Sequence, residues 1–380
     1  KEMSKKNYKK SRKYKKMRRR KIIFGIEITV LLILSGILFV YAWINRSMDK
    51  MNQDTLDSSQ IQINSEVKAN TDLSQMSGTQ VIALVGVDAR GVEGSELAES
   101  MNSDTIILCC IDHDKQEIRM VSIMRDTWMN MAKYTDEYYE FDKANSAYNR
   151  GGPESMLSML NTNLDFALTD YVTVNFKALA DAIDVLGGLD IEMTNAECVH
   201  ANNYNREVSE AQGVEYEAIP YDEDLGDDYS EVRHVSGALA TSYARIRYGG
   251  GDDYRRTERQ RTVLTAMMQK AQKSNILTLN KLINAAFGDI QTSFSNTDLL
   301  ALATKVFSYD IGDTTGFPYE KTTHKYDKIG DVVIPCDLAS NVTQLHQFLF
   351  NDENYTPSAT VLSNSQQIIS NTGYKQGDGH

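Results

Sequence analysis

The strongest feature of the hydropathy pattern is an unbroken apolar stretch near the start of the chain. It runs for 23 residues from Ile22 to Ile44 and contains one charged residue, Glu27. A helix rises about 1.5 Å per residue, so about 20 apolar residues cross the hydrocarbon core of a membrane. The pattern predicts a transmembrane helix over residues 22–44. Residues 39–46 lack a small-residue cleavage site, so we expect an uncleaved anchor.

Beyond the apolar stretch, the pattern changes twice. Residues 45–79 are rich in Ser, Asn, Asp and Gln and show no periodic apolar face, as is typical of a linker. Short β-branched apolar runs then alternate with stretches of helical period, which predicts a layered α/β domain over residues 80–362. Within it, residues 195–235 are acidic and irregular and predict a variable excursion. We expect residues 363–380 to be disordered.

The domain pattern predicts its elements in order. The expected strands are residues 81–87, 105–112, 118–123, 170–176 and 189–193. The expected helices are residues 153–164, 176–188 and 256–273, followed by a weaker helical stretch over residues 277–287 and 297–307. The polar turn between the second and third strands predicts a hairpin. Together these elements predict a three-layer α-β-α domain with a central mixed sheet, preceded by one transmembrane helix.

Charge is distributed unevenly along the chain. Residues 1–21 hold 13 Lys and Arg against one acid, and such flanks stay in the cytoplasm. We expect a short cytoplasmic tail and an extracytoplasmic domain; a tail that binds anionic lipid or nucleic acid is the alternative. Beyond residue 27 there are 27 basic and 50 acidic residues, a net charge of −23. The domain is therefore not expected to bind nucleic acid, and any anion needs a local cationic pocket.

Four cysteines are too few for a disulfide scaffold. Cys109 and Cys110 are adjacent in an apolar run and are expected to pack as small apolar side chains. A disulfide between Cys198 and Cys336 in an oxidising exterior is left open by the sequence.

Arginines concentrate in one short segment of the domain. Six Arg and no Lys lie between residues 245 and 261, and the planar guanidinium suits phosphate oxygens. We expect residues 245 and 247 to share one face of a strand, and residues 256 and 259 to share one face of a helix. The segment indicates a pyrophosphate or polyanion site. The alternative is a solvated helix with ion pairs to Asp252, Asp253 and Glu258.

Three polar clusters lie where predicted strands begin or end, which is where ligand sites gather in layered α/β proteins. They are GVDAR with Asp88 and Arg90, SDT with Asp104, and RDT with Arg125 and Asp126. Carboxylates such as these are ligands for Mg²⁺ that also contacts a diphosphate. A turn or cap role is the alternative for each aspartate.

Six ordered motifs resemble the LytR-CpsA-Psr family. They are GVDAR, SDTIIL, VSIMRDTW, KANSAYNRGG, the block from YVTVNF to VLGGLDI, and ALATSYARIRY followed by DDYRRTERQR, and they span about residues 80–272. The resemblance implies a type II membrane protein of a Gram-positive-type bacterium. It implies a Mg²⁺-dependent phosphotransferase that moves a phospho-glycopolymer from an undecaprenyl-pyrophosphate carrier to a peptidoglycan hydroxyl. The expected partners are this lipid-linked glycan, peptidoglycan and membrane lipid.

The resemblance also implies site residues. Asp88 and Asp104 match the family's metal-associated aspartates, and Arg125 matches the arginine of its RDT motif. The expected pyrophosphate-binding residues are Arg90, Arg125, Arg245, Arg247, Arg255, Arg256, Arg259 and Gln260. The doublets at 252–253 and 255–256 leave open which member fills each role. Arg125, Asp126 and Asp253 are the expected catalytic residues, with the two aspartates as alternatives for the general base.

Three other functions remain open. The same site could pass the phospho-glycan to water, as a hydrolase. The chain could bind a ligand outside and signal inward, although a tail of 21 residues is too short for a helix-turn-helix. It could also carry a lipid-linked glycan without turnover.

Overall fold

The structure is a computed structural model in which two compact units comprise residues 1–49 and 50–380. The described residues all lie in the second unit: 52–53, 56–69, 78–87, 101–132, 139–247, 252–275, 277–278, 281–282, 290–295, 298, 302, 305 and 308–379. The expected cytoplasmic tail and transmembrane helix lie outside them. No helix in the described ranges is long and apolar enough to span a bilayer.

A seven-stranded mixed sheet forms the centre of the fold, in the order β1-β10-β7-β2-β3-β4-β11. Its strands are β1 (Asn52–Gln53), β2 (Thr79–Val87), β3 (Ser103–Asp112), β4 (Glu117–Ile123), β7 (Tyr171–Asn175), β10 (Ile290–Thr292) and β11 (Asp310–Phe317). β3 pairs antiparallel with β2 and β4, while β2 pairs parallel with β7. The predicted hairpin and mixed sheet are confirmed.

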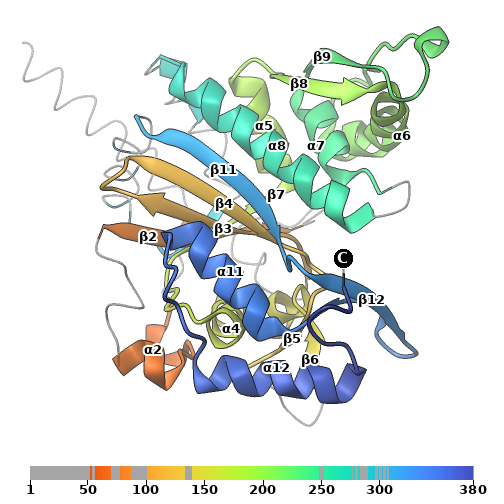
Figure 1. The fold of residues 1–380 in the computed structure, drawn as a ribbon. Coiled ribbons are helices and arrows are strands. Elements are labelled where there is room, and N and C mark those ends of the chain that lie inside the picture. Colours follow the sequence, from red (N-terminus) through yellow and green to blue (C-terminus); the bar gives the residue numbers. More distant parts are fainter. Residues whose placement is uncertain are drawn as a thin grey trace, which may run out of the picture. The chain divides into compact units, whose positions relative to one another are not determined.

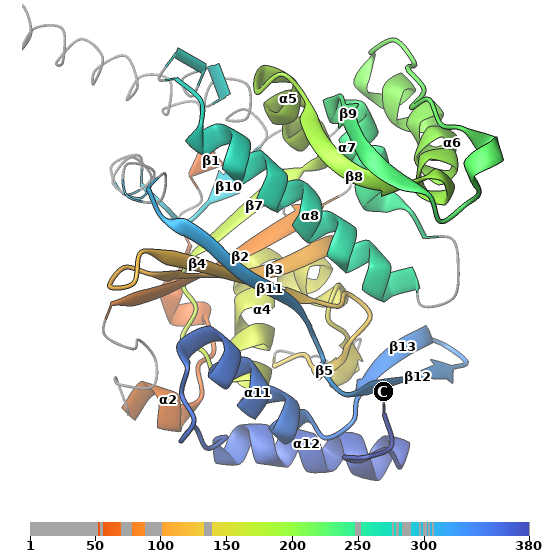
Figure 2. The ribbon, with the colours of Figure 1, turned by 45° about the horizontal axis from the view of Figure 1, so that its top comes forward.

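Helices cover both faces of this sheet (Figures 1 and 2). On one face lie α5 (Phe176–Val185), α7 (Gly237–Arg245) and α8 (Asp252–Gln272). On the other lie α4 (Ser146–Leu164), α11 (Leu338–Phe350) and α12 (Ala359–Thr372). α4 is broken at Gly151 and Gly152, so its second part begins near the predicted start at Pro153.

Alternate side chains of β3 pack into two hydrophobic clusters, one on each face of the sheet. Ile106 and Leu108 join the cluster that contains residues of α4 and α11. Ile107 and Cys109 join the opposite cluster, against which Leu264 of α8 packs. Successive side chains of a strand point to opposite faces, so the continuous apolar pattern of β3 follows from burial on both sides.

Within the described residues, three further pairs of short strands lie beside the sheet. They are β5 (Trp128–Asn130) with β6 (Phe141–Lys143), β8 (Leu189–Thr194) with β9 (Ser230–Val235), and β12 (Lys321–Tyr326) with β13 (Gly330–Pro335), and each pair is antiparallel. The short helices are η1 (Ser58–Gln60), α2 (Ser65–Ala69) and η3 (Glu223–Leu225).

The prediction that residues 195–235 are irregular is wrong. They contain α6 (Asn195–Gln212), which begins in a capping box formed by Thr194 and Glu197, and they end with β9. The buried positions of α6 mix the apolar residues Cys198, Ala201 and Val208 with polar ones, so its apolar stripe is interrupted. Asn202 and Asn205 hold the returning chain by donating to the carbonyls of Ile219 and Glu217 at 2.9 and 2.6 Å.

The prediction of a disordered end from residue 363 is also wrong. α12 spans Ala359–Thr372 and buries Val361 and Ile368 in the core shared with α4 and α11. Ser358 caps its start, and Gly373 ends it in the left-handed conformation. The polar composition of the segment reflects its exposed face.

All four cysteines are free and buried. Cys198 belongs to the core beneath α6, whereas Cys336 follows β13. The disulfide left open by the sequence is absent from this structure.

Candidate active site

Three arginines from distant segments converge on Asp104 at the start of β3. Arg125, in the turn after β4, places Nη1 2.5 Å from Oδ1 of Asp104. Nη2 of Arg256, on α8, lies 3.3 Å from the same oxygen, and Nη2 of Arg247, just after α7, lies 3.7 Å away. The ends of a strand, a turn and two helices thus meet at one carboxylate.

Electrostatics keep Asp104 ionised. Burial opposes its charge, but the guanidiniums of Arg256, Arg125 and Arg247 outweigh this effect and hold the pKa of Asp104 below its ordinary value. Burial lowers the pKa of Arg256 to about 10, so it remains a cation at neutral pH. Three guanidiniums and one carboxylate leave a surplus of two positive charges, which matches the roughly two negative charges of a diphosphate diester.

Arg256 has donors without an acceptor. Its side chain is 3% exposed, and within the described residues its Nε and Nη1 have no hydrogen-bond partner. A buried donor without a partner costs about 1–3 kcal/mol, and more when it is charged. The site can therefore bind a ligand whose oxygens accept hydrogen bonds from Arg256, beside Asp104.

A polar pocket of about 620 Å³ opens on one side of this cluster. Asp104, Arg125 and Asp126 line it. Asp126 is buried; its Oδ2 lies 3.3 Å from Nε of Arg125, and its Oδ1 lies 3.1 Å from Nζ of Lys143. The carboxylate of Asp126 is thus held in place at the pocket wall.

An apolar cavity of about 310 Å³ lies between the sheet and helices α5 and α8. Its lining is mostly aliphatic, with Ala182 and Val263 among the apolar residues, and Thr105 is one of its few polar members. Gln260 of α8 also lines it, and neither Nε2 nor Oε1 of this buried amide has a hydrogen-bond partner among the described residues. The cavity therefore suits a long apolar group that carries a polar end.

The polar pocket and the apolar cavity lie on opposite faces of the sheet. Asp104 lines the first and its neighbour Thr105 lines the second, as the alternation of a strand requires. The polar pocket is bordered by residues of α4 and β6, whereas the cavity is bordered by α5 and α8. The arginine cluster lies between them.

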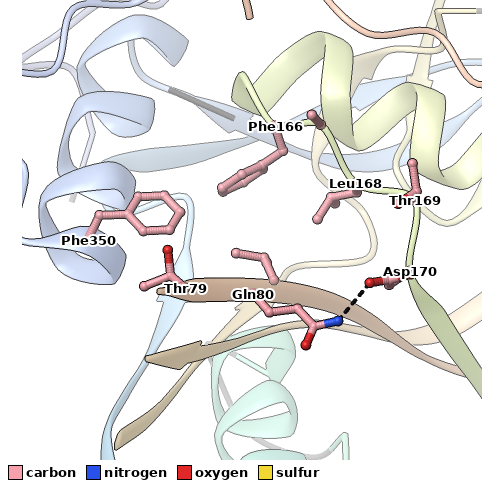
Figure 3. Close-up of a pocket in the computed structure, with 9 residues that line it drawn as sticks. Thr79, Gln80, Phe166, Leu168, Thr169, Asp170 and Phe350 are labelled. Atoms are coloured by element: carbon pink, nitrogen blue, oxygen red, sulfur yellow. Dashed lines mark hydrogen bonds between the residues drawn. The ribbon is translucent and has the colours of Figure 1, made fainter. Parts of the chain in front are cut away.

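Another pocket, of about 200 Å³, is shown in Figure 3. Nε2 of Gln80 donates to Oδ2 of Asp170 at 2.8 Å, and Phe166 and Phe350 lie opposite (Figure 3). This pocket is at the start of β2, whereas the arginine cluster is beyond its other end. Nine residues of strand span about 30 Å, so this pocket is separate from the arginine site.

The arginines predicted from sequence fall into different environments. Arg247 and Arg256 contact Asp104, but Arg255 is exposed. This difference distinguishes the two members of the doublet. Arg259 faces away from Asp104: its Nε lies 2.8 Å from Oε1 of Glu197, and its Nη1 donates to the carbonyl of Ile246 at 3.2 Å. Arg259 therefore joins α8 to α6.

The expectation of a strand through Arg245 and Arg247 is wrong. α7 extends to Arg245, and Ile246 follows it as the cap. Ser236 caps the start of α7 by accepting from the backbone N–H of Leu239. α7 packs closely on α5, since a Cβ on Gly237 would lie 2.1 Å from the carbonyl oxygen of Ala180. The guanidinium of Arg245 lies 5.7 Å from the ring centroid of Phe176, within the range of a cation–π contact.

Several predicted site residues are not described. Asp88 and Arg90 lie outside the described residues. Asp253 lies in the first turn of α8, and its side chain is not described. Their roles stay predictions. The described part of the chain contains no group of three His, Cys, Asp or Glu side chains placed to hold a metal.

Lys143 was missed as a site residue, although it lies in the motif KANSAYNRGG. Its Nζ is 3.1 Å from Asp126. Lys143 ends β6, a strand of three residues, and nothing in the local sequence pairs it with an aspartate 17 positions earlier. The motif itself was the available signal.

Known proteins share sequence similarity with this chain. The chain is 26% identical over 232 residues to Polyisoprenyl-teichoic acid--peptidoglycan teichoic acid transferase TagV of Bacillus subtilis, covering 58% of this chain and 51% of TagV. It thus spans about half the length of that relative. The transferase of the same description, TagU, from Enterococcus faecalis is 26% identical over 285 residues, covering 74% of this chain and 81% of TagU.

Solved structures share the fold. The crystal structure of B. subtilis TagV superposes with a TM-score of 0.53 at 23% identity, covering 73% of this chain and 98% of that one. The model of the LytR_cpsA_psr family matches residues 38–325. The chain therefore belongs to the LytR-CpsA-Psr family.

Proposed function

We propose that this protein is a phosphotransferase that moves a phospho-glycopolymer from an undecaprenyl-pyrophosphate carrier to a hydroxyl of peptidoglycan. The observation that carries the proposal is the buried guanidinium of Arg256, whose Nε and Nη1 have no partner within the described residues. It lies beside Asp104, between an apolar cavity and a polar pocket. The names of the relatives support the same reaction class.

The apolar cavity and the arginine cluster suit the two parts of a lipid-linked diphosphate. A polyprenyl chain would occupy the apolar cavity, where burial of each CH₂ contributes about 0.8 kcal/mol. Its diphosphate would then reach Arg125, Arg247 and Arg256, with Gln260 beside the junction of lipid and phosphate. This arrangement supports a lipid-linked donor.

Mg²⁺ fits this site only in part. It keeps several waters and binds through one or two carboxylates together with substrate phosphates. Asp104 supplies one carboxylate next to the arginines, and we propose Asp88 as the second. When bound there, Mg²⁺ would neutralise charge that develops on the phosphate oxygens.

The protein's own residues would stabilise the transition state by position and charge. The arginines hold the phosphate oxygens in a partly buried site, where fixed donors act strongly on developing charge. Asp126, oriented by Lys143 and Arg125, is our proposed general base for the acceptor hydroxyl. Asp253 is the alternative base.

Reaction at the outer face of the membrane follows from the sequence predictions. The proposed anchor over residues 22–44 and the linker over residues 45–79 would keep the domain within reach of a lipid-linked donor. We therefore propose a type II cell-membrane protein with its catalytic domain outside the cell.

The test is a transfer assay with the full chain in detergent. The purified protein is incubated with a polyprenyl-diphosphate glycan, Mg²⁺ and peptidoglycan fragments, and the products are analysed by mass spectrometry. We expect a phosphodiester conjugate of glycan and peptidoglycan. Free phospho-glycan as the sole product would contradict the proposal and establish a hydrolase. Donor binding without turnover under all acceptor conditions would establish a carrier.

A further inference from the structure

The polar pocket beside Asp104 lies next to the arginine cluster and across the sheet from the apolar cavity. Asp104 and Arg125 belong both to its wall and to the arginine cluster, while the apolar cavity begins across the sheet at Thr105. A donor whose lipid occupies the cavity and whose diphosphate contacts the arginines would therefore direct its reacting phosphorus toward the polar pocket.

The geometry of phosphoryl transfer fixes the side from which the attacking hydroxyl approaches the phosphorus. The attacking and leaving oxygens lie roughly in line on opposite sides of the phosphorus. In the proposed reaction the leaving group is the lipid phosphate, which is on the cavity side. The attacking hydroxyl must then approach from the opposite side, where the polar pocket lies.

The lining of this pocket suits a sugar. Asn102 offers an amide group for hydroxyls, Asp142 lines the wall as the ion-pair partner of Arg150, and Lys328 contributes a cation from the turn between β12 and β13. Tyr139 offers an aromatic ring at the rim and is 51% exposed. Its backbone is held, because Nη1 of Arg150 donates to the carbonyl of Tyr139 at 2.8 Å.

We propose that this polar pocket is the subsite for the acceptor glycan, with Lys328 and Tyr139 as acceptor-binding residues; the inference rests on the proposed function. The acceptor hydroxyl oxygen forms a bond to the phosphorus that bears the donor glycan. The bond from that phosphorus to the bridging oxygen breaks, and its electron pair leaves with the lipid monophosphate. Asp126 takes the hydroxyl proton and releases it to solvent.

The test uses two pairs of matched variants in the full chain. Lys328→Ala is compared with Lys325→Ala, an exposed lysine of the same hairpin that does not line the pocket. Tyr139→Ala is compared with Tyr229→Ala, which is 39% exposed and distant in sequence from every pocket residue. For each variant, KM is measured separately for a soluble peptidoglycan oligosaccharide and for the lipid-linked donor.

We expect Lys328→Ala and Tyr139→Ala each to raise KM for the oligosaccharide about tenfold, through loss of a charged hydrogen bond at Lys328 and of an apolar ring contact at Tyr139. KM for the donor should remain unchanged, and both controls should match the wild type. A rise in KM for the donor instead would overturn the proposal and assign the pocket to the donor's own glycan. Equal values for all variants would show that the pocket binds no saccharide.

A binding measurement separates this inference from the proposed function. Titration calorimetry with the oligosaccharide alone should show weaker binding for Lys328→Ala than for Lys325→Ala. If the wild type transfers nothing but this difference persists, the reaction class is wrong and the saccharide subsite stands. Absence of oligosaccharide binding by an active wild type that holds its donor would overturn the subsite alone.

Discussion

At the residue scale, burial decides which arginine of a doublet acts. Arg255 and Arg256 are adjacent and chemically identical, yet consecutive positions of a helix point about 100° apart. Arg256 is buried beside Asp104, and Arg255 is exposed. A sequence carries no direct record of which side of α8 faces the sheet end, so the doublet stayed ambiguous until the fold placed it.

Replacement of the two arginines should therefore have unequal effects. Arg256→Ala removes a buried charged donor and is expected to lower kcat/KM for transfer at least 100-fold, or about 3 kcal/mol. Arg255→Ala, which removes the same charge, should lower it less than threefold. Steady-state transfer rates measure both. Equal losses for the two variants would show that Arg255 turns into the site when donor binds.

At the element scale, α12 contributes to the core. Ile368 is fully buried, whereas Leu362 of the same helix is 46% exposed. Ile368→Ala should lower the free energy of unfolding by about 2–5 kcal/mol through the cavity it leaves. Leu362→Ala should change it by less than about 0.5 kcal/mol. Denaturant unfolding followed by circular dichroism compares the pair, and similar small values would mean that α12 does not pack as described.

A buried histidine makes α11 sensitive to acid. His346 donates from Nε2 to the carbonyl of Leu164 at 2.8 Å, and its ring stacks on Tyr355 with centroids 3.7 Å apart. Burial lowers the pKa of His346 from 6.5 to about 4. Between these pH values the unfolded chain binds more protons than the folded chain, so stability rises with pH across this window.

The contribution of His346 to the free energy of unfolding should therefore be fully present above pH 6.5. It should decrease by about 3 kcal/mol as the pH falls to about 4. His346→Gln removes the titrating group, so its curve should be flatter over the same range. Urea titrations at a series of pH values measure the difference. Parallel curves for wild type and variant would place His346 in contact with water.

At the scale of the whole molecule, the apolar cavity should set the donor's chain length. Ala182→Leu adds three carbons to the lining of this cavity. We expect KM for a full-length polyprenyl donor to rise about tenfold, since part of the chain is excluded, while KM for a short-chain diphosphate stays unchanged. Assays with both donors measure this. The melting temperature serves as the control for folding, and equal effects on the two donors would place the lipid elsewhere.

Much of the domain was determined by the sequence itself. Residues on β2, β3, β4 and β7 alternate or run apolar in short β-branched patterns that favour strands of a covered sheet, and their ranges match the structure closely. Local rules failed where tertiary contacts replaced apolar periodicity. α6 is held by amides that bond to a distant loop, and α7 ends where the strand of Arg245 was expected.

The chemistry of the site was also present in the sequence, as residue types that favour phosphate and metal. What the tertiary structure decided is which of them meet. Asp104, Arg125, Arg247 and Arg256 are separated by up to 152 positions and join because strand ends and helix ends converge at one edge of a sheet. Salt screens the attraction between exposed charges beyond about 10 Å, so only the folded chain determines that Arg256 lies beside Asp104 while Arg259 pairs with Glu197.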